Sequence, residues 1–170
     1  GQVFEGSGLS MDDISWIDFY SCFPSAVEFA RDAFGLSKDD PRDLTVTGGL
    51  PFHGGAGNNY VMNSIATMVE TVRVNRESFG LVTANGGYLS KHSAGIYSTT
   101  PVSGSWSRRD PSEYQSLIDT IPDVRFVELP SGDAVIETYT VLYGRDNRPS
   151  QAIVVGRLEN SSSPRFVSVM

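Results

Sequence analysis

The sequence predicts an α/β fold, a mixed sheet with packed helices, over residues 1–100, followed by a small antiparallel β-barrel-like unit over residues 101–170. Two observations carry this prediction. In the first part, short apolar stretches alternate with stretches whose apolar residues recur at the 3.6-residue spacing of a helix. After Pro101, only short β-branched stretches follow, and turn-forming residues separate them.

The first part contains four stretches that favour strands and two that favour helices. The expected strands are "DISWIDFYSCF", "DLTVTGG", "FGLVTANGG" and "SAGIYSTTP". One helix is expected after a capping box formed by Ser25 and Glu28, with Gly35 at its end. The other begins at Tyr60, and its apolar residues are Met62, Ile65, Ala66, Val69 and Val72.

The second part begins with a linker that contains a short expected helix at Glu113 to Asp119. Four expected strands follow, "VRFVELP", "AVIETYTVLYG", "QAIVVGRLE" and "RFVSVM", separated by "SGD", "RDNRPS" and "NSSSP". Four short strands at this spacing are typical of a small antiparallel sheet or barrel.

Composition excludes several classes of function. The net charge of −7 disfavours nucleic acid and anionic membranes as partners. No apolar run is long enough to span a bilayer, and no secretory signal precedes the first strand. A single cysteine excludes an internal disulfide and suits the cytoplasm, and no Cys/His set for a metal is present. The chain opens on "GQVFEG" without a methionine, which favours a portion of a longer protein.

The one cysteine, Cys22, is expected at the end of a buried strand and just before a helix. The dipole at a helix N-terminus stabilises a thiolate, so Cys22 is a candidate acid/base or nucleophile. The alternative is a small buried apolar residue without chemistry.

Five glycines lie between residues 48 and 57, and Asn58 and Asn59 follow them directly before the Tyr60 helix. Free N–H groups at such a helix start bind an anion or a carbonyl oxygen. The spacing matches neither a Walker loop nor the dinucleotide fingerprint. In the alternative interpretation, the glycines form a turn and an asparagine caps the helix.

His53 and His92 are the only histidines, so a histidine general base would have to be one of them. Asn85, in "ANGG", is a candidate hydrogen-bond donor to a developing oxyanion. The alternatives are a core or rim position for His53 and a merely solvated hairpin position for His92.

In their order along the chain, these motifs resemble the C-terminal half of a thiolase, of the thiolase-like acetyl-CoA acetyltransferase type with an added C-terminal domain. "DFYSCF" resembles the HDCF motif of sterol-carrier-protein-type thiolases. "TGGLPFHGGAGNN" takes the place of the GG-x4-GHP loop, and "LVTANGG" that of the last catalytic loop. Residues 101–170 resemble the β-barrel-like, OB-like extra domain of some thiolase-like proteins.

The resemblance implies roles for particular residues. Cys22 matches the cysteine that moves the proton, and Asn85 matches the asparagine of the last catalytic loop. His92 is placed with them as a catalytic residue, and the implied thioester-binding residues are Gly55, Gly57, Asn58, Asn59, Gly86 and Gly87. The family's GHP histidine falls on Gly55, however, and His53 lies two residues earlier.

Three hypotheses about function follow. In the first, the chain is part of an acyl-CoA acyltransferase whose nucleophilic cysteine lies in an N-terminal thiolase half that the sequence does not contain, so the chain alone is inactive. In the second, the same loops bind acyl-CoA without chemistry. In the third, the β tail docks a partner. The coenzyme A thioester is a substrate rather than a cofactor, no metal is expected, and a homo-oligomer is a further expectation.

Overall fold

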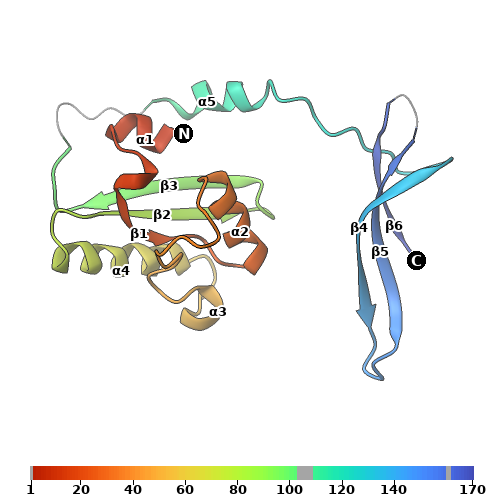
Figure 1. Cartoon of the computed structure of the whole chain (residues 1–170), viewed down its shortest axis with the longest axis horizontal. Helices are drawn as coiled ribbons and strands as arrows, with labels where there is room; N and C mark the ends of the chain where they lie inside the picture. Colours follow the sequence, from red (N-terminus) through yellow and green to blue (C-terminus); the bar gives the residue numbers. More distant parts are fainter. Residues whose placement is uncertain (1, 103–108, 160–161) are drawn as a thin grey trace. The chain divides into compact units, whose positions relative to one another are not determined.

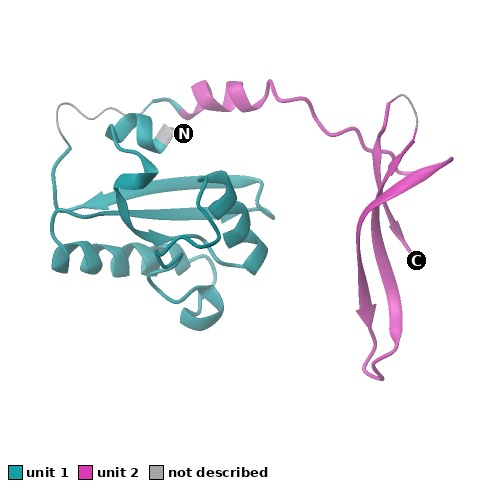
Figure 2. Cartoon of the chain, in the orientation of Figure 1, with its two compact units in different colours: residues 1–110 teal, residues 111–170 magenta. Residues whose placement is uncertain are grey.

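The computed structural model describes residues 2–102, 109–159 and 162–170. The chain forms two compact units, Gly1–Asp110 and Pro111–Met170 (Figures 1 and 2). The first unit holds a mixed three-stranded sheet with helices, and the second holds a three-stranded antiparallel sheet. The predicted combination of an α/β part and an antiparallel β part is therefore confirmed. Among the described residues, no helix is long and apolar enough to cross a membrane.

The sheet of the first unit has the order β1-β2-β3, with β1 at Ile14–Asp18, β2 at Phe79–Gly86 and β3 at Lys91–Ser98 (Figure 1). β1 pairs with β2 in parallel, and β2 pairs with β3 as an antiparallel hairpin. Since β1 and β2 run in the same direction, their carboxyl ends lie at the same edge of the sheet.

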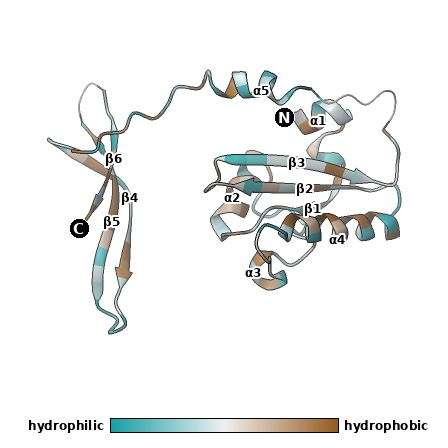
Figure 3. Cartoon of the chain, turned by 180° about the vertical axis from the view of Figure 1, so that it is seen from behind, coloured by the Kyte–Doolittle hydropathy of each residue, from teal (hydrophilic) through white to brown (hydrophobic). Residues whose placement is uncertain are grey.

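Helices cover both faces of this sheet. The helices of the first unit are α1 (Gln2–Ser7), the short 3-10 helix η1 (Met11–Asp13), α2 (Pro24–Ala33), α3 (Leu50–His53) and α4 (Tyr60–Val74). Leu81 belongs to a core cluster with side chains of α1 and α2, whereas the next residue, Val82, packs with Met68 and Val72 of α4. This alternation is the period of a strand buried on both faces. Figure 3 shows apolar and polar segments alternating along α4.

The stretch "DLTVTGG" does not form the strand that the sequence predicts. The backbone N–H groups of Val46 and Thr47 instead donate to the side chain of Asp18, at 3.0 and 3.2 Å. A side-chain acceptor that takes backbone donors competes directly with a strand ladder. The carboxylate of Asp18 therefore replaces a neighbouring strand at this point.

The helix after Cys22 also begins earlier than the expected capping box. α2 starts at Pro24 with Phe23 as its N-cap, and no side chain caps it. Proline suits the first helical position because the N–H that it lacks would have no partner there. Ser25 consequently lies inside the helix, and the predicted capping box with Glu28 is wrong.

The second unit contains α5 (Pro111–Ile118) and a sheet of β4 (Ala134–Tyr143), β5 (Pro149–Leu158) and β6 (Arg165–Val169), in that order. The sequence predicted a small antiparallel sheet or barrel, and the described residues form the sheet, which is open because β4 and β6 are its two edges. Most side chains of β4 are exposed, and the buried apolar residues of the unit are Val154, Leu158 and Phe166.

The first of the four expected strands in this unit, "VRFVELP", is not a strand. It contributes a single bridge between Phe126 and Arg165 on β6. Two hydrogen bonds support the bridge, from Val127 N to Arg165 O and from Arg165 N to Arg125 O. Pro122 lies two residues before the stretch, and Pro130 is its last residue. Proline cannot donate to a ladder, so pairing does not extend past these positions.

The buried hydroxyl of Ser64 leads to a prediction about the stability of the fold. The Ser64 side chain on α4 is fully buried, and its Oγ has no hydrogen-bond partner among the described residues. An unsatisfied buried polar group costs about 1–3 kcal/mol. We expect Ser64→Ala to raise the free energy of unfolding, measured in urea, by about 1 kcal/mol, with a further small gain from helix propensity.

Ser116→Ala on α5 is the control for that experiment, because the Ser116 hydroxyl is exposed and donates to Ser112 O at 2.7 Å. It should change stability less than Ser64→Ala. Destabilisation by Ser64→Ala would show that the Ser64 hydroxyl has a partner in solution.

A second prediction concerns acid stability. Arg42 donates two hydrogen bonds to Asp40, at 2.8 and 2.7 Å, and also donates to Met11 O and Ile14 O. The side-chain hydrogen bonds from Arg42 lower the pKa of Asp40 from 3.8 to about 2. Because the folded state has the lower pKa, this pair stabilises the fold above pH 3.8 and loses that effect as the pH falls toward about 2.

We therefore expect Asp40→Asn to lower the melting temperature at neutral pH, with the difference from wild type shrinking between about pH 4 and pH 2. The exposed neighbour Asp39 supplies the control variant Asp39→Asn. A difference between Asp40→Asn and wild type that stays constant down to pH 2 would contradict the assigned coupling.

Candidate functional site

The loops that leave β1 and β2 meet at the carboxyl edge of the sheet, as the parallel pairing requires. The segment after β1 carries Cys22, and Asn85 lies near the end of β2. The Cys22 Sγ donates a weak hydrogen bond to Asn85 Oδ1 at 3.7 Å. Both side chains are partly exposed. Two residues 63 positions apart in the sequence therefore form a polar pair that solvent and a ligand can reach.

His92 lies across the hairpin from this pair. Its backbone is opposite that of Asn85 in the β2–β3 register, and directly opposed residues of an antiparallel pair project from the same face. The exposed His92 ring has its Nε2 at 2.6 Å from the carbonyl oxygen of Leu89. That nitrogen is therefore engaged by the hairpin turn rather than by Cys22. Both Asn85 and His92 lie in strands, where the sequence predicted loop positions.

The glycine segment reaches the Cys22 turn through Ser21. The backbone N–H of Leu50 donates to Ser21 Oγ at 2.8 Å, and the Ser21 side chain is buried. A Cβ atom on Gly49 would lie 3.3 Å from the same Ser21 oxygen. The start of the glycine segment therefore packs directly against the residue that precedes Cys22.

Beneath these loops lies a buried polar cluster that the sequence analysis did not identify. Asp18, the last residue of β1, is fully buried and accepts hydrogen bonds from Thr47 Oγ1 at 3.1 Å and from Tyr60 Oη at 3.0 Å. Thr47 Oγ1 and Tyr60 Oη are 2.6 Å apart. Burial raises the pKa of Tyr60, so the phenol stays protonated and donates at neutral pH. A charged residue inside the apolar run "SWIDFY" was the one sequence feature that pointed to this cluster.

Backbone conformation accounts for most of the glycines. Gly48 and Gly49 have φ angles of 85° and 91°, and Gly54 and Gly57 have φ angles of 81° and 59°. Residues with a side chain rarely adopt this left-handed region. At position 55 close packing explains the glycine instead, because a Cβ atom there would lie 3.1 Å from Tyr60 and 3.2 Å from Leu50. The turn interpretation therefore explains these glycines without a ligand.

The remaining predicted residues have other surroundings in the structure. Asn58 and Asn59 are exposed, and Asn59 takes the N-cap position of α4 without a side-chain capping bond. Gly86 ends β2, and Gly87 begins the hairpin turn with a φ of 56°. Among the hydrogen bonds of the described residues, none joins Asn58 or Asn59 to Cys22 or Asn85. Their roles in binding stay predictions.

His53 also lies apart from the thiol. It is the exposed last residue of α3, and its ring contacts the ring of Tyr60 edge to face at a centroid distance of 6.2 Å. Neither histidine of the chain hydrogen-bonds Cys22. In the described residues, the thiol therefore has an amide neighbour but no imidazole base.

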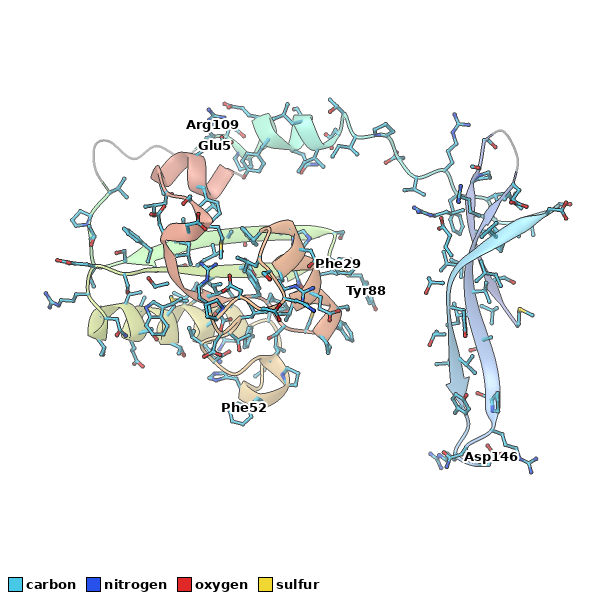
Figure 4. All side chains as sticks on the ribbon, in the orientation of Figure 1. Glu5, Phe29, Phe52, Tyr88, Arg109 and Asp146 are labelled. Carbon is cyan, nitrogen blue, oxygen red and sulfur yellow. The ribbon has the colours of Figure 1, made fainter. Side chains whose placement is uncertain are left out.

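Exposed aromatic side chains lie at the same end of the first unit. Phe23 follows Cys22 directly and is 61% exposed, Phe29 on α2 is 63% exposed, and Tyr88 at the hairpin tip is 99% exposed. Figure 4 shows Phe29 and Tyr88 projecting outward near the hairpin, and Phe52 projecting from α3. Of these rings, that of Phe23 offers apolar surface at the residue that follows Cys22.

Comparisons with a family model and with solved structures both indicate a thiolase-like protein. Residues 113–170 match the family described as the thiolase-like protein type 1 additional C-terminal domain. Among solved structures, the chain is similar to the crystal structure of a monomeric SCP2-thiolase-like protein type 1 from Mycobacterium smegmatis, with 44% sequence identity and a TM-score of 0.85. The match covers 99% of this chain and 36% of that chain, so this chain spans about a third of that protein's length. No curated protein matches the sequence.

The closeness of Gly49 to Ser21 leads to a prediction that has a matched control. Alanine at position 49 or 54 would be strained, because both glycines combine a positive φ with a ψ of 160° or 162°, a conformation that costs other residues about 1–3 kcal/mol. Only at position 49 does the new Cβ meet a neighbour, Ser21 Oγ at 3.3 Å, whereas nothing lies within 4 Å at position 54. We expect Gly49→Ala to destabilise the chain more than Gly54→Ala in urea unfolding.

The two variants should also differ at the thiol. Gly49→Ala should change the rate at which iodoacetamide labels Cys22, the only cysteine, and Gly54→Ala should leave it unchanged. Equal losses of stability together with unchanged labelling in both variants would show that the two loops are not coupled through Ser21.

Proposed function

Because the chain is thiolase-like and carries the additional C-terminal domain of type 1 thiolase-like proteins, we propose that its site binds the thioester of an acyl-CoA. This family assignment confirms the resemblance seen in the sequence motifs. The observation that carries the proposal is the contact of Cys22 Sγ with Asn85 Oδ1 at 3.7 Å, across the carboxyl edge of the parallel pair.

The chemistry of this pair suits a thioester. A thioester has a weakly polar carbonyl oxygen beside a soft sulfur atom, and the Asn85 amide is both a donor and an acceptor of hydrogen bonds. The Cys22 sulfur is itself soft and polarizable. The exposed ring of Phe23 next to Cys22 provides apolar surface for a short acyl group. Binding of this kind needs no base, which agrees with the positions of the two histidines.

Acyl transfer is the second candidate, and the same contact favours it. In that reaction Cys22 would move the proton and the Asn85 amide would stabilise the oxyanion. The nucleophilic cysteine would come from an N-terminal thiolase half, because this chain has no second cysteine. The lack of a histidine hydrogen bond to Cys22 among the described residues weighs toward binding without transfer. An acyl-CoA ligand and an unpaired cysteine both fit a cytoplasmic location.

The proposal predicts that acetyl-CoA protects the only thiol of the chain. Iodoacetamide labelling of Cys22, followed by intact mass spectrometry, should slow severalfold when acetyl-CoA is added at saturating concentration. Asn85→Ala should abolish this protection because it removes the amide that faces the thiol. Asn63→Ala on α4 is the control and should keep the protection of the wild-type chain.

Neither candidate gives the chain alone a nucleophile, so both predict that the chain is inactive in thiolysis. The 170-residue chain should release no acetyl-CoA from acetoacetyl-CoA and coenzyme A. Turnover that disappears in Cys22→Ser would contradict this expectation and overturn the binding-only proposal. If iodoacetamide labelled Cys22 at the same rate at all acetyl-CoA concentrations, the proposed thioester site would be ruled out.

A further inference from the structure

We propose that Asp18 is a positioning residue of this site, because its buried carboxylate holds both ends of the glycine-rich segment 48–59 and so fixes that segment beside Cys22. The effect on ligand binding rests on the proposed function, whereas the effect on the segment does not. Sequence motifs gave Asp18 no role, since it reads as an interruption of an apolar strand.

The environment of Asp18 is unusual for a carboxylate. The side chain is fully buried at the end of β1, and no cationic side chain of the described residues pairs with it. Buried charges normally need a counter-charge or a full set of hydrogen bonds. Asp18 has the second, because Oδ2 accepts from Val46 N, Thr47 N and Thr47 Oγ1, and Oδ1 accepts from Tyr60 Oη.

These donors come from the two boundaries of the glycine segment. Thr47 immediately precedes Gly48, and Tyr60 immediately follows Asn59. Thr47 Oγ1 also accepts a hydrogen bond from Gly49 N at 3.2 Å and lies 2.6 Å from Tyr60 Oη. One carboxylate and two hydroxyls therefore close the segment into a loop whose ends are fixed to β1.

The interior of the segment lacks comparable anchors. Residues 51–59 are all exposed, and the Leu50 contact with Ser21 is its link to the Cys22 turn. An exposed loop with few buried contacts opens locally at low cost. Its position beside Cys22 therefore depends on the fixed ends, so weakening the hydroxyl contacts to Asp18 should loosen the loop first.

Thr47 and Thr71 provide matched variants. Thr47→Val keeps the shape of the side chain and removes its hydroxyl, while Thr47→Ser keeps the hydroxyl. Thr71→Val on α4 is the control, because it also removes a threonine hydroxyl that makes a hydrogen bond, to Thr67 O at 2.9 Å. Tyr60→Phe removes the other hydroxyl donor to Asp18 and keeps the ring that packs on Tyr20.

We call the fixing of both ends of segment 48–59 by Asp18 the clamp. Amide hydrogen exchange of the 170-residue chain tests it. The amides to follow are those of Leu50, His53 and Gly54, whose acceptors remain in every variant. We expect them to exchange about tenfold faster in Thr47→Val and in Tyr60→Phe, the effect of losing about one hydrogen bond. Thr47→Ser and Thr71→Val should exchange like wild type, and α2 should be unchanged in all four variants.

Two results would overturn the clamp. One is unchanged exchange in both Thr47→Val and Tyr60→Phe. The other is equal acceleration in α2 and in the loop, which would mean that the cluster only holds the unit together. The acetyl-CoA protection of Cys22 is the second readout, and it should need about tenfold more acetyl-CoA in Thr47→Val but not in Thr47→Ser. If wild type shows no protection, the thioester site fails while the exchange data still decide the clamp.

Discussion

The parallel pairing of β1 with β2 is the constraint on which the rest of the first unit depends. It brings Asp18 level with Val82 in the register, so the segments that follow both strands leave from the same edge. The contact between Cys22 and Asn85 is a direct consequence, although the two residues lie far apart in the sequence. An antiparallel arrangement would send the two segments to opposite edges and separate the thiol from the amide.

The end of β1 shows how one buried side chain substitutes for secondary structure. The backbone donors of Val46 and Thr47 need acceptors because the stretch runs beside the sheet, and the carboxylate of Asp18 accepts from both. Those donors in turn compensate the burial of a charge that lacks a cation. The same interaction that prevents a fourth strand therefore also stabilises the carboxylate and fixes the start of the glycine segment.

The spacing of apolar residues predicted the helices and strands that local hydrogen bonds or buried apolar faces stabilise. α4 begins at Tyr60 as expected, and β2 and β3 follow from their apolar residues. At Val46–Thr47 and at "VRFVELP", a predicted strand lacks a neighbouring strand that pairs with it along its length. The carboxylate of Asp18 takes the place of that neighbour at Val46–Thr47, and "VRFVELP" makes only one bridge to β6. Sequence patterns do not show that neighbour. Motif order predicted that Cys22 and Asn85 belong to one site, whereas Asp18, Thr47 and Tyr60 come together only in three dimensions.

The positions of the two histidines decide how the site is understood. A thiol takes part in proton transfer efficiently when a base lies within hydrogen-bond reach. His92 Nε2 instead faces Leu89 O, and the His53 ring packs on Tyr60. Either ring would have to leave its present partner to form a hydrogen bond with Cys22. The proposed binding of a thioester by Cys22 and Asn85 requires no such movement. Acyl transfer would require a rearrangement of this edge of the sheet that the proposed binding does not.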